Sequence, residues 1–209
     1  MNGPDFVRLI QAIHTAMEAA QTELNALDSE LGDGDHGGAL ATAFADAAEK
    51  AAALTNPTPS TVLAVTAQSL LNRMGGASGA LYGTLFLRMS ASCKDRTELT
   101  LADWQAALQA GLEGVQARGK AAPGDKTLVD ALAPAVAAVS TSDTLGGAFA
   151  AAAAAAQAGA DQTAEMVAKF GRAKFVGERA RGHVDAGARS MAVLFAALHR
   201  YQEDEDGKT

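Results

Sequence analysis

The chain has 209 residues, with 48% hydrophobic residues and 50 alanines, and this composition fits one helical domain with a well-buried core. The formal net charge is −7, and no stripe of basic residues is present that could neutralise a phosphate backbone, which argues against a nucleic-acid partner. A single cysteine excludes an internal disulfide, and neither a signal peptide nor a membrane-spanning apolar run is evident, so we expect a cytoplasmic protein.

Apolar residues near the N-terminus recur at spacings of three and four, as on one face of a helix. They predict a first helix from about Asp5 to about Leu27, which ends at an acidic, glycine-rich loop. Further helices are expected over residues 38–54, 60–74, 80–93, 100–118, 128–139, 144–160 and 191–198. Residues 1–209 are therefore expected to form one domain, with a solvated acidic tail at about 202–209.

The loops between these helices fall into two kinds. If eight helices alternate up and down, loops one, three, five and seven share one end of the bundle. These loops comprise residues 28–37, 75–79, 119–127 and 170–187, and they are the richest in glycine and charge. The fold class predicted is therefore an all-α, eight-helix antiparallel bundle with its functional site in the loops at one end.

Three carboxylates in and beside the first loop are candidate metal ligands. Asp28, Asp33 and Asp35 offer the hard oxygen atoms that Mg²⁺ prefers, and such a site leaves room for phosphate oxygens. A calcium-binding EF-hand is excluded because Phe44 stands where its twelfth position requires a glutamate. The other interpretation is that these acids only cap the next helix or lie in a solvated turn.

Glycine-rich segments elsewhere indicate anion binding. Residues 75–79, Gly-Gly-Ala-Ser-Gly, precede a predicted helix, whose N-terminal amides would face an anion. The cations Lys120, Lys126, Arg172 and Arg179 could compensate phosphate charge, although each alone is more typical of an ordinary surface residue. No P-loop or Rossmann motif is present. A metal site beside phosphate-binding loops predicts a phosphoryl-transfer protein.

The chain resembles the nucleotide-binding subunit L of bacterial dihydroxyacetone kinases, a module that also forms the C-terminal domain of the single-chain ATP-dependent enzymes. The matching stretches cover nearly the whole chain in order: Leu27-Asp28-x-x-x-Gly32-Asp33-x-Asp35-His36-Gly37, residues 75–79, Gly119-Lys120-x-x-Pro123-Gly124-Asp125-Lys126-Thr127, and the segment from Gly171 to Ala188. A related module of fatty-acid kinases has threonine where this chain has His36, which favours the dihydroxyacetone branch.

The resemblance implies an eight-helix barrel with the nucleotide at one end and assigns roles to particular residues. Asp28, Asp33 and Asp35 would bind two Mg²⁺ ions at the diphosphate of ADP or ATP. The nucleotide would be lined by His36, Gly37, Gly38, Ala39, Ala77, Ser78, Gly119, Leu128, Arg172, Asp185, Ala186 and Gly187. The family often has lysine in place of Phe170 and proline in place of Ala186, so one phosphate or partner contact is missing and one turn is looser.

The family's reaction divides the work between subunits. Dihydroxyacetone would be held on a separate K subunit, and this chain would present the terminal phosphoryl group of its nucleotide, with no nucleophile of its own. Because the module stands alone, it resembles the phosphoenolpyruvate-dependent type, in which bound ADP is rephosphorylated by a phosphocarrier subunit M. The alternatives are an ATP-exchanging kinase subunit for dihydroxyacetone or another small ketose, and a nucleotide-sensing regulatory module. Such a bundle is compatible with a monomer or a homodimer.

Overall fold

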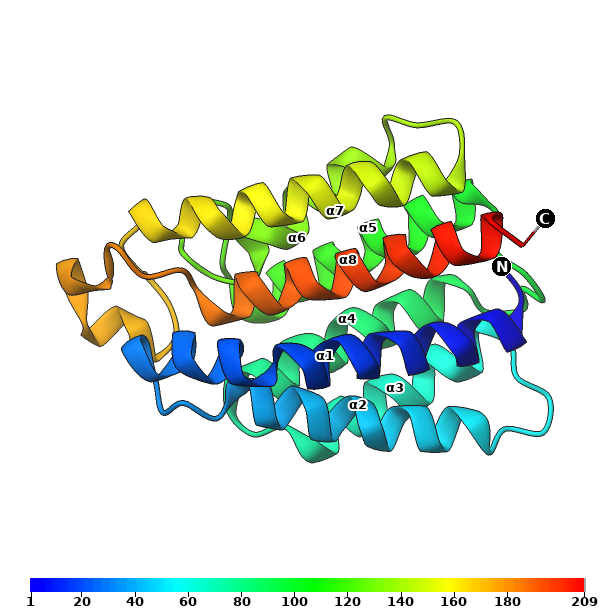
Figure 1. Ribbon diagram of the computed structural model, residues 1–209, viewed down its shortest axis with the longest axis horizontal. Helices are drawn as coiled ribbons and strands as arrows, with labels where there is room; N and C mark the ends of the chain where they lie inside the picture. Colours follow the sequence, from blue (N-terminus) through cyan, green and yellow to red (C-terminus); the bar gives the residue numbers. More distant parts are fainter. Residues whose placement is uncertain (209) are drawn as a thin grey trace.

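The computed structural model describes residues 1–208, which form eight α-helices that run alternately up and down the molecule (Figure 1). Between α7 and α8 lie three short 3₁₀ helices, and β pairing among the described residues is limited to one isolated bridge. The bounds are α1 Gly3–Leu31, α2 His36–Ala52, α3 Pro59–Arg73, α4 Gly76–Ser92, α5 Leu101–Gly119, α6 Val129–Val139, α7 Leu145–Gln162, η1 Thr163–Glu165, η2 Arg172–Phe175, η3 Gly177–Ala180 and α8 Ala186–Asp206. The predicted all-α fold class is confirmed.

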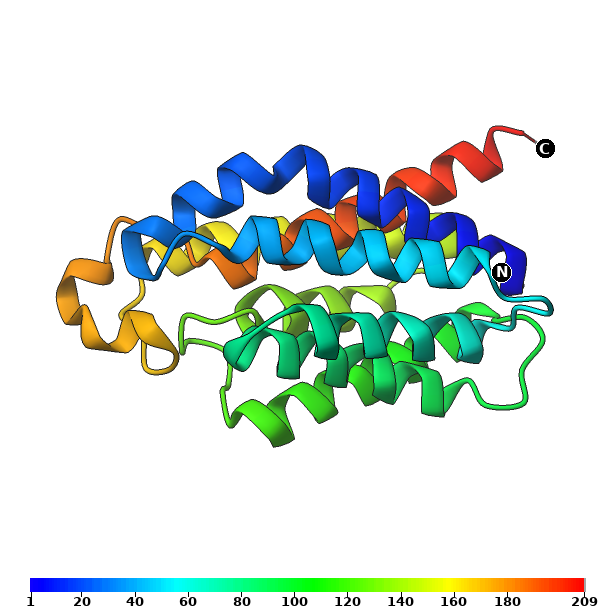
Figure 2. The same cartoon turned by 90° about the horizontal axis from the view of Figure 1, so that it is seen from below.

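The helices close into a ring. Each helix packs against the next one along the chain, and α8 returns to lie against both α1 and α7. Both termini lie at one end of the molecule, and the segment between α7 and α8 lies at the other (Figures 1 and 2). None of the helices in the described part of the chain is both long enough and apolar enough to cross a membrane.

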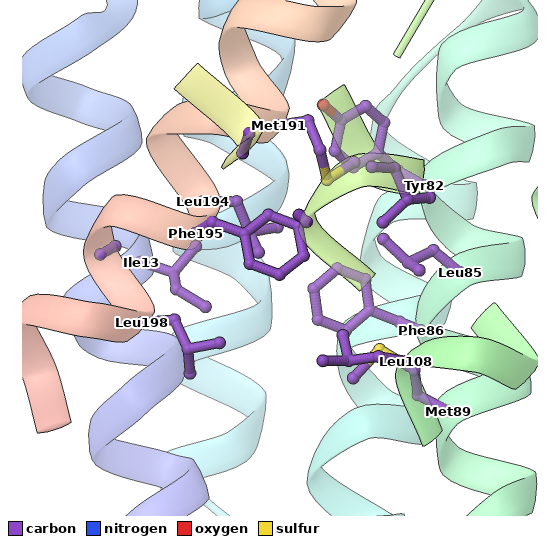
Figure 3. Close-up of a cluster of buried hydrophobic side chains, with 14 of the residues drawn as sticks. Ile13, Tyr82, Leu85, Phe86, Met89, Leu108, Met191, Leu194, Phe195 and Leu198 are labelled. Carbon is purple, nitrogen blue, oxygen red and sulfur yellow. The ribbon is translucent and has the colours of Figure 1, made fainter. Parts of the chain in front are cut away.

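The core fills the centre of the ring with side chains from helices far apart in sequence. Figure 3 shows Ile13 of α1 and Phe195 of α8 on one side, facing Phe86 of α4 and Leu108 of α5 on the other. Full burial of one such side chain contributes about 1.5–3 kcal/mol. This packing fixes the directions of the helices and therefore brings alternate loops to the same end.

Several helix boundaries differ from the predicted ones. α1 continues one turn beyond Leu27, which places Asp28 on the helix, and α4 begins at Gly76 instead of Ala80. α3 begins after Thr58, whose hydroxyl accepts a hydrogen bond from the Thr61 amide, because Pro59 suits the first helical position. α8 spans Ala186–Asp206 and is therefore longer at both ends than the predicted helix over 191–198, so the acidic tail is helical as far as Asp206. Thr209 lies outside the described residues.

Candidate nucleotide and metal site

A cavity of about 720 Å³ opens at the end of the bundle opposite the termini. Its volume is in the range of small-molecule sites, about 300–1,000 Å³. Four stretches of chain line it, within residues 27–39, 74–81, 115–129 and 170–187. These are the loops that the sequence placed at one end, together with the helix termini next to them.

The three candidate metal ligands converge at this cavity. Oxygen atoms of Asp28, Asp33 and Asp35 all lie within 4.8 Å of one another. The Asp28 carboxylate accepts hydrogen bonds from the amides of Gly34 (2.8 Å) and Asp35 (3.1 Å). These bonds fold the turn between α1 and α2 around the Asp28 side chain. Gly34 has φ of +78°, a left-handed conformation that glycine adopts without strain. A cluster of carboxylate oxygens open to the cavity fits a hard divalent cation that keeps room for water and phosphate ligands.

Arg172, which also lines the cavity, reaches this cluster. Its guanidinium forms an ion pair with Asp33 and lowers the pKa of that carboxyl below its usual range. Both side chains remain largely exposed, at 66% for Arg172 and 44% for Asp33. The pair places a cation next to the cluster of carboxylates, and guanidinium is a group that also binds phosphate.

His36 opens α2 and lines the cavity, but it is held by a buried polar network. Its Nε2 lies 2.8 Å from Ser190 Oγ, and the Tyr82 hydroxyl lies 2.7 Å from the same oxygen. Ser190 in turn donates to the carbonyl of Gly187, 3.0 Å away. Burial lowers the pKa of His36, which favours a neutral imidazole. Sequence analysis did not identify Ser190 or Tyr82, because both lie among buried residues of their helices and look like ordinary core positions.

The two glycines after His36 face α1. A Cβ atom on Gly37 would lie 2.3 Å from the carbonyl oxygen of Gln21, so this position requires glycine for the close approach of α1 and α2. The Gly38 amide donates to Asn25 Oδ1 at 3.1 Å. Ala39, the next residue, lines the cavity. The nucleotide contacts expected at Gly37 and Gly38 stay predictions.

The N-terminus of α4 points into the cavity. Because α4 begins at Gly76, both Ala77 and Ser78 lie in its first turn, where backbone amides have no partner inside the helix. Gly76 has φ of +65°, and a Cβ on it would meet nothing within 4 Å. This wall of the cavity therefore offers amide donors to an anion.

Gly119 at the end of α5 and Leu128 in the turn before α6 both line the cavity. The shape of this turn is set by Asp130, whose carboxylate accepts from the amides of Gly124 (2.5 Å) and Thr127 (2.7 Å). Lys126 was a candidate to compensate phosphate charge. In the structure its ammonium is buried and donates hydrogen bonds to two backbone carbonyls.

The last wall is the start of α8. Asp185 caps this helix by accepting a hydrogen bond from the Ala188 amide at 2.8 Å, and burial raises the pKa of Asp185 to about 6. Ala186 and Gly187 also line the cavity. Of the residues that the family resemblance assigns to the nucleotide and the metal, all except Gly37 and Gly38 thus line one cavity. Two of the other candidate cations, Lys120 and Arg179, do not line it.

Comparison with known proteins identifies the family of the chain. A family model described as the DAK2 domain matches residues 30–200. The chain is 37% identical over 203 residues to the PEP-dependent dihydroxyacetone kinase 2, ADP-binding subunit DhaL, of Listeria innocua, with 95% of this chain and 94% of that protein covered. It is 35% identical to the L-erythrulose 1-kinase of Mycolicibacterium smegmatis, with 93% of this chain but 35% of that protein covered.

A solved structure has the same fold. The dihydroxyacetone kinase of C. freundii in complex with AMP-PNP and Mg²⁺ superposes with a TM-score of 0.75 at 29% identity, covering 93% of this chain and 33% of that one. The chain spans about one third of that enzyme, whereas it spans nearly all of the Listeria subunit. The chain belongs to the DAK2 domain family.

Proposed function

We propose that the chain is the ADP-binding subunit of a phosphoenolpyruvate-dependent dihydroxyacetone kinase. The observation that carries this proposal is the convergence of three aspartate oxygens within 4.8 Å at a cavity large enough for a nucleotide. Support comes from relatives that match over 94% and 85% of their own length and are named ADP-binding subunits of such kinases.

The residues around the cavity divide the work of binding. Asp28, Asp33 and Asp35 would hold two Mg²⁺ ions, which supply charge neutralisation for the phosphates when bound. The amides of Ala77 and Ser78 would donate to phosphate oxygens. Catalysis in this arrangement rests on positioning and charge compensation by the chain's own groups.

Two further groups complete the nucleotide site in this proposal. Arg172 would leave Asp33 and pair with a phosphate, since guanidinium binds phosphate oxygens in the same forked geometry as it binds carboxylate. Leu128 would pack beside the base, because it is buried within the apolar part of the cavity wall.

The partner subunits are also part of the proposal. Segment 169–181 carries five cations and one glutamate in a chain whose net charge is −7, and it lies at the rim of the cavity. Phe175 at its tip is 80% exposed, which is unusual for a large aromatic side chain. This basic, aromatic tip would help to dock the K subunit that holds dihydroxyacetone, and a phosphocarrier M subunit would recharge the bound ADP.

The test is to purify the chain without added nucleotide, denature it and identify any released nucleotide by chromatography. About one ADP per chain, converted to ATP by phosphoenolpyruvate and the phosphocarrier proteins, supports the proposal. An empty protein that exchanges Mg·ATP freely favours the second candidate, an ATP-dependent kinase for a small ketose. The similarity to L-erythrulose 1-kinase favours that candidate, and transfer to L-erythrulose instead of dihydroxyacetone would establish it.

A further inference from the structure

Lys126 is a lysine whose ammonium group is almost completely buried. The residue is 1% exposed, and its Nζ donates hydrogen bonds of 2.5 Å to the carbonyl oxygens of Thr163 and His183. These two carbonyls belong to the two ends of segment 163–183, the connection that contains Arg172 and lines the cavity. One side chain therefore links the two ends of this segment, which we call its base.

Other bonds cross the same base. The Gly182 amide donates to the Ala164 carbonyl at 2.8 Å, and the Asp185 amide donates to Thr163 Oγ1 at 2.9 Å. Beyond the base, the segment packs its small side chains, Ala168, Ala173 and Ala180, against Leu31 at the end of α1. This satellite cluster is small, so the attachment of the segment depends on its polar contacts.

The residue before Lys126 holds the same segment at a second point. Asp125 accepts a hydrogen bond of 2.7 Å from the Lys169 ammonium, and its carbonyl accepts from the Lys169 amide at 3.2 Å. The residues after it, Thr127 and Leu128, line the cavity. The turn before α6 thus contacts both the cavity and the segment that covers it.

Burying the ammonium group of Lys126 costs desolvation free energy. Desolvation lowers the pKa of Lys126, and the carboxylates of Asp185 and Asp130 compensate its charge from beyond ion-pair distance. A methionine of similar volume would avoid the cost of burying a charge. What the ammonium adds is the ability to donate to two carbonyls at once.

We propose that Lys126 is a positioning residue that keeps segment 163–183 closed over the cavity, so that Arg172 stays within reach of the cavity and bound nucleotide leaves slowly. This inference rests on the proposed function for its nucleotide but not for its structural content. Thr163 O also accepts from the Met166 amide, so loss of the ammonium releases the His183 end of the segment first.

The test compares Lys126→Met with wild type by amide hydrogen exchange and by dissociation of a fluorescent ADP analogue in the presence of Mg²⁺. We expect exchange at Lys169, Gly182 and Asp185 to rise at least tenfold, with no change in the core helices. We expect the analogue to dissociate at least tenfold faster. The affinity for Mg²⁺ alone should stay within twofold, because the three aspartates are untouched. Lys126→Arg, which keeps the donors, should restore slow exchange in part.

The matched control is Lys94→Met, which removes an exposed lysine after α4, at the far end of the molecule. It should behave as wild type in all three measurements. Unchanged exchange in segment 163–183 of Lys126→Met would overturn the inference. So would a uniform rise across all helices or loss of the fold, since either would make Lys126 a general structural residue. If wild type binds no nucleotide, the proposed function fails, and the exchange data still decide the role of Lys126.

Discussion

At the scale of the residue, the site is governed by how each charge is compensated. Asp28 is held by two backbone amides, Asp33 by Arg172, and Lys126 by two carbonyls. The first two pairings leave carboxylate oxygens at the cavity, whereas the third buries the ammonium against backbone carbonyls. Residue type alone does not separate these cases, because a lysine in a glycine-bearing loop has the same sequence signature whether it binds phosphate or a carbonyl.

Asp33→Asn tests the acidic cluster at this scale. The change keeps the size of an exposed side chain but removes one anionic oxygen, so we expect Mg²⁺-dependent ADP affinity to fall at least tenfold, about 1.4 kcal/mol or more. Stability should change by less than about 0.5 kcal/mol, as for most surface substitutions. Isothermal titration calorimetry measures the first and urea denaturation the second. Asp95→Asn, at an exposed turn after α4, is the control that should leave both unchanged.

At the scale of the element, packing between neighbouring helices decides which glycines are required. The positions of the helices follow from apolar periodicity, so the sequence predicted all eight. The predicted end of α1 is one turn early, because the polar residues 28–30 continue the helix without continuing its apolar pattern. The predicted start of α4 is late, because the glycines of residues 76–79 form its first turn. The network of His36, Tyr82 and Ser190 was beyond sequence analysis, because it depends on contacts among three separate helices.

Gly37→Ala and Gly38→Ala form a matched pair at the seam of α1 and α2. The added methyl group at Gly37 would clash with backbone at 2.3 Å, whereas that at Gly38 would meet nothing closer than 3.6 Å. We expect Gly37→Ala to lower the free energy of unfolding by about 1–3 kcal/mol. Gly38→Ala should be neutral or raise it by up to about 1 kcal/mol, because alanine favours helix. Equal effects of the two changes in urea denaturation would contradict this account of the seam.

Asp46 ties α2 to α3 and predicts a pH dependence of stability. Its carboxylate accepts from Lys50 (2.5 Å), Ser69 (2.6 Å) and Arg73 (2.6 Å), and the Lys50 bond contributes most to lowering the pKa of Asp46. A depressed pKa in the folded state gives stability that is present above the unfolded pKa of about 3.9 and is lost as pH falls below it. Asp46→Asn should therefore destabilise the protein at pH 7 by about 1–2 kcal/mol.

The difference between Asp46→Asn and wild type should shrink as the pH is lowered from about 4 toward 2, as the wild-type carboxylate takes up its proton. Chemical denaturation across this pH range measures it. Glu49→Gln, on the exposed side of the same helix, is the control and should show no such gap. A gap that stays constant with pH would show that the charge of Asp46 is not what links the two helices.

At the scale of the whole molecule, the alternation of helix direction separates stability from function. One end contains both termini and ordinary connections, and the other contains the cavity with its acidic cluster, helix N-terminus and basic segment. The sequence predicted this separation from the composition of alternate loops. It could not predict that segment 163–183 is fastened by a buried lysine, since that requires knowing which carbonyls lie within reach.

The most direct measurement is calorimetric titration of nucleotide-free protein with ADP, with Mg²⁺ and then with EDTA in its place. The account predicts one site per chain with Mg²⁺, and at least a tenfold loss of affinity without the metal or after simultaneous replacement of Asp28, Asp33 and Asp35 by asparagine. ADP binding that is indifferent to Mg²⁺ and to these three residues, or no binding at all by a folded protein, would contradict it.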